Sequence, residues 1–153
     1  MYQVTKTRNA ICGIWRKNPK DNDPEVLVVT VTSRDSKGRV ISTEVKFPGG
    51  GNRIPNEPVI VNLLREVLEE TYLIFLPDSA KEIWSREATD GHHTKFGFLV
   101  LFEHCYGELR KESFIEDGDE VSPPRFVKLN KLRNLICPAH YRFYRAVCQE
   151  LYH

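Results

Sequence analysis

A glycine-rich turn followed by an acidic helix, Gly49 to Leu73, constrains this chain more than any other segment. Pro48 and three glycines end a run of strand-like residues, and an apolar pattern at helical spacing begins at Asn56 or Glu57. The apolar stripe is formed by Ile60, Leu63, Leu64, Val67 and Leu68. Off that stripe, and within roughly a third of a turn of one another, lie three carboxylates: Glu66, Glu69 and Glu70. The segment predicts a helix that packs one face on the core and presents acidic groups on another.

Strand-like segments lie on both sides of this helix. Val26 to Thr32 is β-branched throughout except for one leucine, which predicts a strand buried on both faces, and Val40 to Phe47 is expected to pair with it as a hairpin. Further strands are expected at residues 5–15, 82–88, 94–102 and 126–129, a polar loop at 107–124 and a closing helix at 138–151. This order predicts a single α/β domain over residues 1–153, with helices on both faces of one sheet.

Composition excludes several classes of function. The chain has 153 residues and a formal net charge of +1, so it offers no strong field for nucleic acid or an acidic membrane surface. Its longest apolar runs are too short to cross a bilayer, and its start lacks the apolar core of an export signal. The four cysteines form no CxxC pair, which favours reduced thiols. We therefore expect a cytoplasmic protein with neither a membrane partner nor a nucleic-acid partner.

Six polar or glycine positions in the segment follow a recognisable spacing. Gly51 is followed after five residues by Glu57, and after seven more by Arg65-Glu66; an aliphatic residue, one further residue and Glu69-Glu70 come next. This pattern resembles the signature of the Nudix hydrolase family. The resemblance implies a Nudix-type α/β/α sandwich with a mixed central sheet. Two departures stand out: Tyr72 replaces the glycine that ends the helix in the family, and the glycine turn is one residue longer, starting at Gly49.

The chemistry of the segment agrees with the resemblance. Mg²⁺ prefers carboxylate oxygens and binds substrate phosphates as well, so Mg²⁺ is the expected cofactor, with Mn²⁺ as a substitute. The expected metal ligands are Glu66, Glu69, Glu70 and the carbonyl of Gly50. Arg65 is expected to hold Glu69 or Glu70 by a bidentate ion pair. Glu57 is expected to orient the glycine loop, and Gly49 and Gly51 to form the turn on the phosphate side.

Two further roles are assigned from position. The general base of relatives is a glutamate of the signature or an acid in a late loop, which here contains Glu116, Asp117, Asp119 and Glu120. Glu120 is favoured because it is nearest the following strand. Lys95 and Arg86 are candidates for contacts with substrate phosphates.

The resemblance implies Mg²⁺-dependent hydrolysis of a phosphoanhydride bond in a nucleoside diphosphate linked to another moiety. A nucleoside triphosphate and a nucleotide sugar are both candidate substrates, since no subfamily marker follows the signature. Two alternatives stay open: a Nudix-fold sensor that binds a nucleotide or ADP-ribose without cleaving it, and an RNA 5′-end pyrophosphohydrolase. A homodimer is a common arrangement among relatives.

Overall fold

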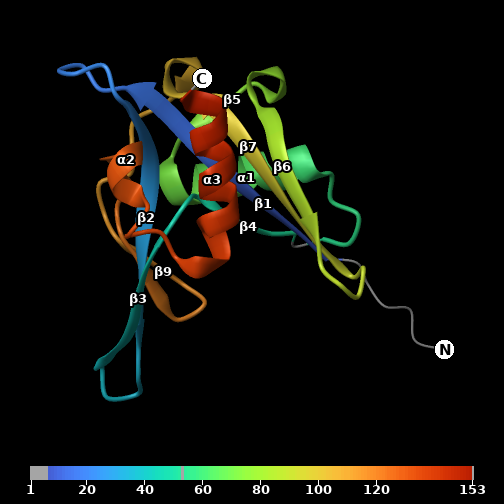
Figure 1. Ribbon diagram of the computed structural model, residues 1–153. Helices are drawn as coiled ribbons and strands as arrows, with labels where there is room; N and C mark the ends of the chain where they lie inside the picture. Colours follow the sequence, from blue (N-terminus) through green and yellow to red (C-terminus); the bar gives the residue numbers. More distant parts are fainter. Residues whose placement is uncertain (1–6, 53, 153) are drawn as a thin grey trace.

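The computed structural model describes residues 7–52 and 54–152, and its centre is a mixed β-sheet (Figure 1). Nine strands of the described residues form this sheet, in the order β6-β7-β1-β2-β10-β9, with β4 on β1 and with β3 and β11 on β2. Their bounds are β1 Thr7–Lys17, β2 Pro24–Arg34, β3 Val40–Lys46, β4 Gly49–Gly51, β6 Lys81–Glu87, β7 His93–Leu101, β9 Phe114–Glu116, β10 Asp119–Val121 and β11 Arg125–Lys128. A second, two-stranded sheet pairs β5 Ile74–Phe75 with β8 Cys105–Tyr106.

Helices cover both faces of the large sheet. The helix α1 (Val59–Thr71) lies behind the sheet in Figure 1, α3 (Tyr141–Leu151) lies in front of it, and the short α2 (Leu129–Leu132) follows β11. The burial of β1 shows why two covers are needed. Ala10 contributes to the core under α1, whereas its neighbour Ile11 contributes to the core under α3. The expected α/β/α sandwich with a mixed central sheet is confirmed.

The central strands separate at one end, and this opens the space for the site. The strands β1 and β2 pair only at Trp15–Lys17 with Pro24–Val26. Further along, β1 takes β4 as its antiparallel neighbour at Asn9–Ile11 and β7 as its parallel neighbour on the other edge. Because both edges of β1 are occupied there, β2 pairs with β3 and β10 instead. The glycine strand β4 is thereby held where the two halves of the sheet part.

Most predicted elements are confirmed, with shifted ends. The helix expected from Asn56 or Glu57 begins at Val59, and Asn56 is not its cap but adopts φ 68°. The polar segment expected to be a loop contains the hairpin of β9 and β10. Its strands have only three residues each, too few to show the alternation on which a strand prediction rests. Thr5 and Lys6, the start of the first expected strand, lie outside the described residues.

Tyr72 ends α1 in the left-handed conformation that the family's glycine would adopt. Its φ is 69° and its ψ is 13°, its N–H donates to the carbonyl of Leu68, and its side chain is exposed. A residue with a Cβ is strained in this region. We expect Tyr72→Gly to raise the free energy of unfolding by about 0.5 to 1 kcal/mol, net of the flexibility that glycine adds to the unfolded chain. Urea denaturation measures this change. Tyr72→Ala is the control, since it removes the ring and keeps the strain; a Gly variant no more stable than the Ala variant contradicts the prediction.

His140 precedes α3 and accepts a hydrogen bond at Nδ1 from the N–H of Phe47, at 3.1 Å. Burial, together with the charges of Lys46 and Lys95, lowers the pKa of His140 to about 3. The folded pKa lies below the unfolded value near 6.5, so the unfolded chain takes up the proton first as the pH falls. We expect His140 to account for a loss of about 2 kcal/mol in unfolding free energy between pH 7 and pH 5. Denaturation at both pH values should show a smaller loss in His140→Gln, and equal losses would exclude this origin.

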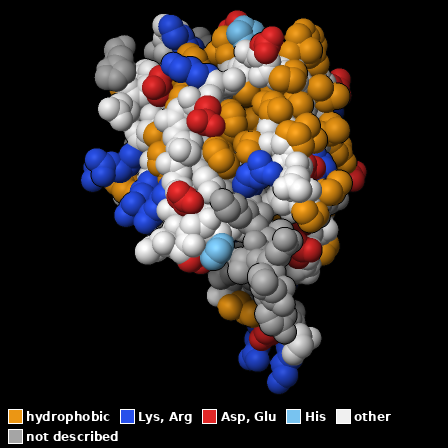
Figure 2. All heavy atoms as spheres, turned by 90° about the vertical axis from the view of Figure 1, so that its right-hand side faces the viewer, with side chains coloured by type: hydrophobic (Ala, Val, Ile, Leu, Met, Phe, Trp, Pro, Cys, Tyr) orange, Lys and Arg blue, Asp and Glu red, His pale blue; other side chains and the backbone are white. Residues whose placement is uncertain are grey.

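Several large hydrophobic side chains remain exposed. On the face shown in Figure 2 they gather toward one side, while basic and acidic side chains are interspersed elsewhere. The exposed set includes Val61 and Leu68 on α1, Ile74 on β5, Leu76 and Tyr106. No helix of the described residues is long and apolar enough to cross a membrane.

Candidate metal centre

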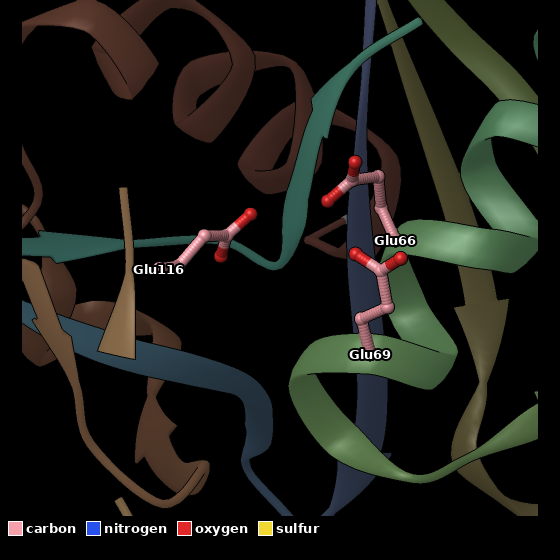
Figure 3. A group of neighbouring side chains, drawn as sticks. All are labelled: Glu66, Glu69 and Glu116. Carbon is pink, nitrogen blue, oxygen red and sulfur yellow. The ribbon is translucent and has the colours of Figure 1, made fainter. Parts of the chain in front are cut away.

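Three carboxylates from two separate elements converge beside the glycine strand. Glu66 and Glu69 project from the same side of α1, and Glu116 faces them from β9 (Figure 3). One carboxylate oxygen from each of the three lies within 4.8 Å of the others. Hard carboxylate oxygens at such separations suit a divalent cation such as Mg²⁺ or Mn²⁺. The helix supplies two of these oxygens from one rigid element, and the hairpin brings the third from a distant part of the chain.

The carboxyl group of Glu66 is buried against Gly50. A Cβ at position 50 would lie 2.6 Å from that carboxyl group, so only glycine permits the contact. The side chain of Glu66 is 4% exposed, and its Oε2 atom has no hydrogen-bond partner among residues 7–52 and 54–152. Burial raises the pKa of Glu66, the hydrogen bond from Arg65 opposes this, and the charge of Glu69 adds to the rise. A buried carboxylate oxygen without a donor is costly, and a bound cation would satisfy it. The residues therefore fit a divalent metal ion.

Arg65 organises the groups around the metal centre. Its Nε and Nη2 atoms donate to the two carboxylate oxygens of Glu57, at 3.2 and 2.8 Å. Nη1 donates to Glu66 at 2.8 Å, and Nη2 also reaches the carbonyl of Gly51 at 3.2 Å. These carboxylates raise the pKa of Arg65 above its usual range, with the bond to Glu57 the largest cause. One guanidinium thus ties the helix, the preceding loop and the glycine strand together.

The prediction that Arg65 forms a bidentate ion pair with Glu69 or Glu70 was wrong. Glu69 lies only at 3.7 Å from Nη1, and the two-oxygen partner is Glu57 instead of Glu69 or Glu70. Helical spacing favours a residue one turn away, but the loop before α1 brings Glu57 closer. The expected role of Glu57 in orienting the glycine loop agrees with this geometry, since Arg65 links it to Gly51.

Glu70 lies beside the three-carboxylate group and is not part of it. Its Oε2 atom accepts a hydrogen bond from the N–H of Gly49 at 3.4 Å. Burial raises the pKa of Glu70 well above its usual value, and Glu116 and Glu66 raise it further. Glu70 lines a hollow of about 180 Å³ together with Gly49, Lys46, Glu116 and Asp119. The structure thus brings Glu70 to the edge of the site, next to the glycine strand.

Asn62 is a site residue that sequence reasoning missed. It is 1% exposed, its Nδ2 donates to the carbonyl of Gly50 at 2.9 Å, and its Oδ1 accepts from Arg65 at 2.9 Å. The Gly50 carbonyl, an expected metal ligand, is therefore already hydrogen-bonded through one of its lone pairs. The only signal in the sequence was an asparagine one turn before Arg65, which is too common to single out.

Glu120, favoured as the general base, points away from the site. Its side chain is 43% exposed and lies 3.9 Å from Arg34. Successive residues of a strand face opposite sides, so on β10 Asp119 and Val121 line the hollow while Glu120 does not. The member of the acidic run that joins the carboxylate group is Glu116. This correction follows from the hairpin, whose existence the sequence did not reveal.

Lys95 and Arg86 lie together, at a different place from the metal centre. They are paired in register on β7 and β6 and line a hollow of about 340 Å³. Trp84 and Arg142, which the sequence analysis did not single out, line the same hollow. The structure thus places the two residues next to each other and away from the glycine turn.

Scans of the sequence against protein-family models and against curated proteins give no match. The fold, in contrast, matches many solved structures. A MutT from a study of Aliivibrio salmonicida and Vibrio cholerae shares 17% identity, with a TM-score of 0.66 over 95% of this chain and 98% of that one. A MutT Nudix hydrolase from Burkholderia pseudomallei shares 18% identity, with a TM-score of 0.65 over 93% and 98%. The Nudix domain of Shewanella oneidensis NrtR, bound to ADP-ribose, shares 13% identity, with a TM-score of 0.65 over 98% and 90%.

These neighbours define the fold class. The chain has the fold of the MutT/Nudix proteins, over nearly its whole length. The family resemblance found in the spacing from Gly51 to Glu70 is thereby confirmed at the level of the fold.

Proposed function

We propose that this protein is a Nudix hydrolase that cleaves a phosphoanhydride bond in a nucleoside diphosphate linked to another moiety, with Mg²⁺ as cofactor and Mn²⁺ as a substitute. The observation that supports this best is the convergence of Glu66, Glu69 and Glu116, with an unpartnered buried oxygen on Glu66. A fold shared with MutT proteins gives that group its chemical context. The four free cysteines fit a reducing cytoplasm.

Glu66, Glu69 and Glu116 would hold the metal ion, with Glu70 at its edge. Bound there, the metal would offset the charge of the diphosphate and lower the pKa of an attacking water. Arg65 fixes Glu66 and, through Glu57 and the carbonyl of Gly51, the glycine strand. Lys46 lines the same hollow as Glu70 and is placed to contact a phosphate oxygen.

Removal of the proton from the attacking water falls to an acid of this hollow. Glu70 and Asp119 line it, whereas Glu120 lies on the other side of its strand. We propose Glu70 as the base, because it lines this hollow beside Glu116 and its Oε2 atom lies next to the glycine strand at Gly49.

A non-catalytic sensor is the main alternative. The NrtR domain was solved with ADP-ribose, so this fold also binds a nucleotide in a complex. The carboxylate group argues for hydrolysis here, since a sensor has no need of three acids that converge on one point. An RNA 5′-end pyrophosphohydrolase is less favoured, because the net charge of +1 provides little attraction for a polyanion.

A product assay separates these functions. The purified protein is incubated with nucleoside triphosphates, nucleotide sugars, ADP-ribose and triphosphorylated RNA, each with Mg²⁺ and each with EDTA. The proposal expects release of a nucleoside monophosphate or pyrophosphate from a small nucleotide, with Mg²⁺ only. Binding of ADP-ribose without products would support the sensor, and cleavage confined to RNA would support the third function.

A further inference from the structure

A second hollow, on the face of the sheet covered by α3, gathers three basic side chains. Arg86 on β6 and Lys95 on β7 are directly opposed in register, so their side chains stand next to each other on one face. Arg142, in the first turn of α3, lines the same hollow of about 340 Å³. The three cations come from three different elements and meet at one place.

The described part of the chain places no acidic side chain in this hollow. Its remaining lining residues there are Trp84, Ala88, Thr89, His93, Pro138 and Ala139. Among the described residues, none of the three cations forms an ion pair with a carboxylate. Like charges in one hollow repel, and an anion with several oxygens relieves that repulsion while it accepts their hydrogen bonds.

The hollow is separate from the metal centre. Gly51 pairs with Asn9, and Asn9 pairs with Lys95, so the Cα atoms of Gly51 and Lys95 are two strand spacings apart, about 10 Å. The hollow and the metal centre also lie on different faces of the sheet. Gly97, which shares the face of Lys95, lies beneath Phe143 of α3, whereas Gly50 contacts Glu66 of α1. A phosphate held by the three cations is therefore not the one beside the carboxylates.

We propose that this hollow binds a second phosphate-type anion, held by Arg86, Lys95 and Arg142 and separate from the metal centre. The anion is either a phosphate at the far end of the substrate or a free phosphate from solution. The first source rests on the proposed hydrolase function; binding of the anion itself does not. The indole of Trp84 offers a flat apolar wall beside the cations, suited to the group that carries the phosphate.

Calorimetric titration of the whole chain with inorganic pyrophosphate, in EDTA, tests the site without turnover. We expect binding that weakens about tenfold in Lys95→Gln and again in Arg142→Gln, which corresponds to the loss of one charged hydrogen bond each. Arg145→Gln is the matched control, because Arg145 is an exposed arginine one turn further along α3 and does not line the hollow. Glu69→Gln should bind pyrophosphate as the wild type does. No binding, or equal binding by all four variants, would overturn the proposal.

Kinetics then distinguish the two sources of the anion. If the substrate supplies it, Lys95→Gln raises KM about tenfold for a nucleotide with an additional distal phosphate and leaves KM for the same nucleotide without that phosphate unchanged. If the anion is free phosphate, both KM values are unchanged, and added phosphate alters turnover in the wild type but not in Lys95→Gln. Both results support the site. Absence of turnover would count against the proposed hydrolase function alone, because the calorimetry decides the anion site.

Discussion

Glu69→Gln and Glu116→Gln each lower turnover by at least about 100-fold, while the fold stays intact. Each change keeps the shape of the side chain and removes one anionic ligand from the group of Glu66, Glu69 and Glu116. The two residues come from α1 and β9, so a loss in both shows that the helix and the hairpin form one site. The measurement is kcat with the nucleotide identified by the product assay, in Mg²⁺, with circular dichroism as the check on folding.

Glu120→Gln is the matched control for this experiment. Glu120 belongs to the same acidic run as Glu116, but its exposed side chain faces Arg34. We expect less than a twofold change in kcat, since an exposed ion pair contributes little. A large loss in Glu120→Gln together with unchanged turnover in Glu116→Gln would reverse the assignment of the two residues.

Arg65→Met lowers the free energy of unfolding by about 3 to 5 kcal/mol. The guanidinium pairs with Glu57 and Glu66, whose side chains are 6% and 4% exposed, and its removal takes a charged hydrogen-bond donor away from both buried carboxylates. Arg65 also bonds Asn62 and the carbonyl of Gly51, so the glycine strand loses its tie to the helix. Urea denaturation of the metal-free protein measures the change.

Arg39→Met serves as the control for Arg65. The side chain of Arg39 is 73% exposed and pairs with Asp35, four residues earlier in the chain. We therefore expect Arg39→Met to lower the free energy of unfolding by less than about 1 kcal/mol. A similarly small loss in Arg65→Met would mean that the buried carboxylates are neutralised in some other way. Addition of Mg²⁺ provides a second test, since the metal should recover part of the stability lost in the variant.

The sequence predicted the parts of the site that lie on one helix. Glu66 and Glu69 are three residues apart on α1, and a short-range spacing of this kind survives into the structure without knowledge of the rest of the fold. The same reasoning failed for Arg65, because it predicted the helical neighbours Glu69 or Glu70 as its partners. Its true partner, Glu57, is brought in by the loop before the helix.

The parts of the site that depend on pairing between distant segments could not be predicted from the sequence. Glu116 reaches the site because β10 pairs with Val31 and Thr32 of β2 and carries β9 with it. The strands of this hairpin have only three residues each, and pairing with β2, which no local sequence pattern predicts, stabilises them. The central strands were easier to predict, because the β-branched composition of the run from Val26 itself indicates a buried strand.

Binding of Mn²⁺, followed by the electron paramagnetic resonance signal of the free ion, tests the central claim most directly because it needs no substrate. The account predicts that the wild-type protein removes Mn²⁺ from solution and that Glu69→Gln and Glu116→Gln weaken this binding at least about tenfold. Glu120→Gln should bind Mn²⁺ as the wild type does. Equal binding by the wild type, Glu69→Gln and Glu116→Gln would contradict a metal centre built from Glu66, Glu69 and Glu116.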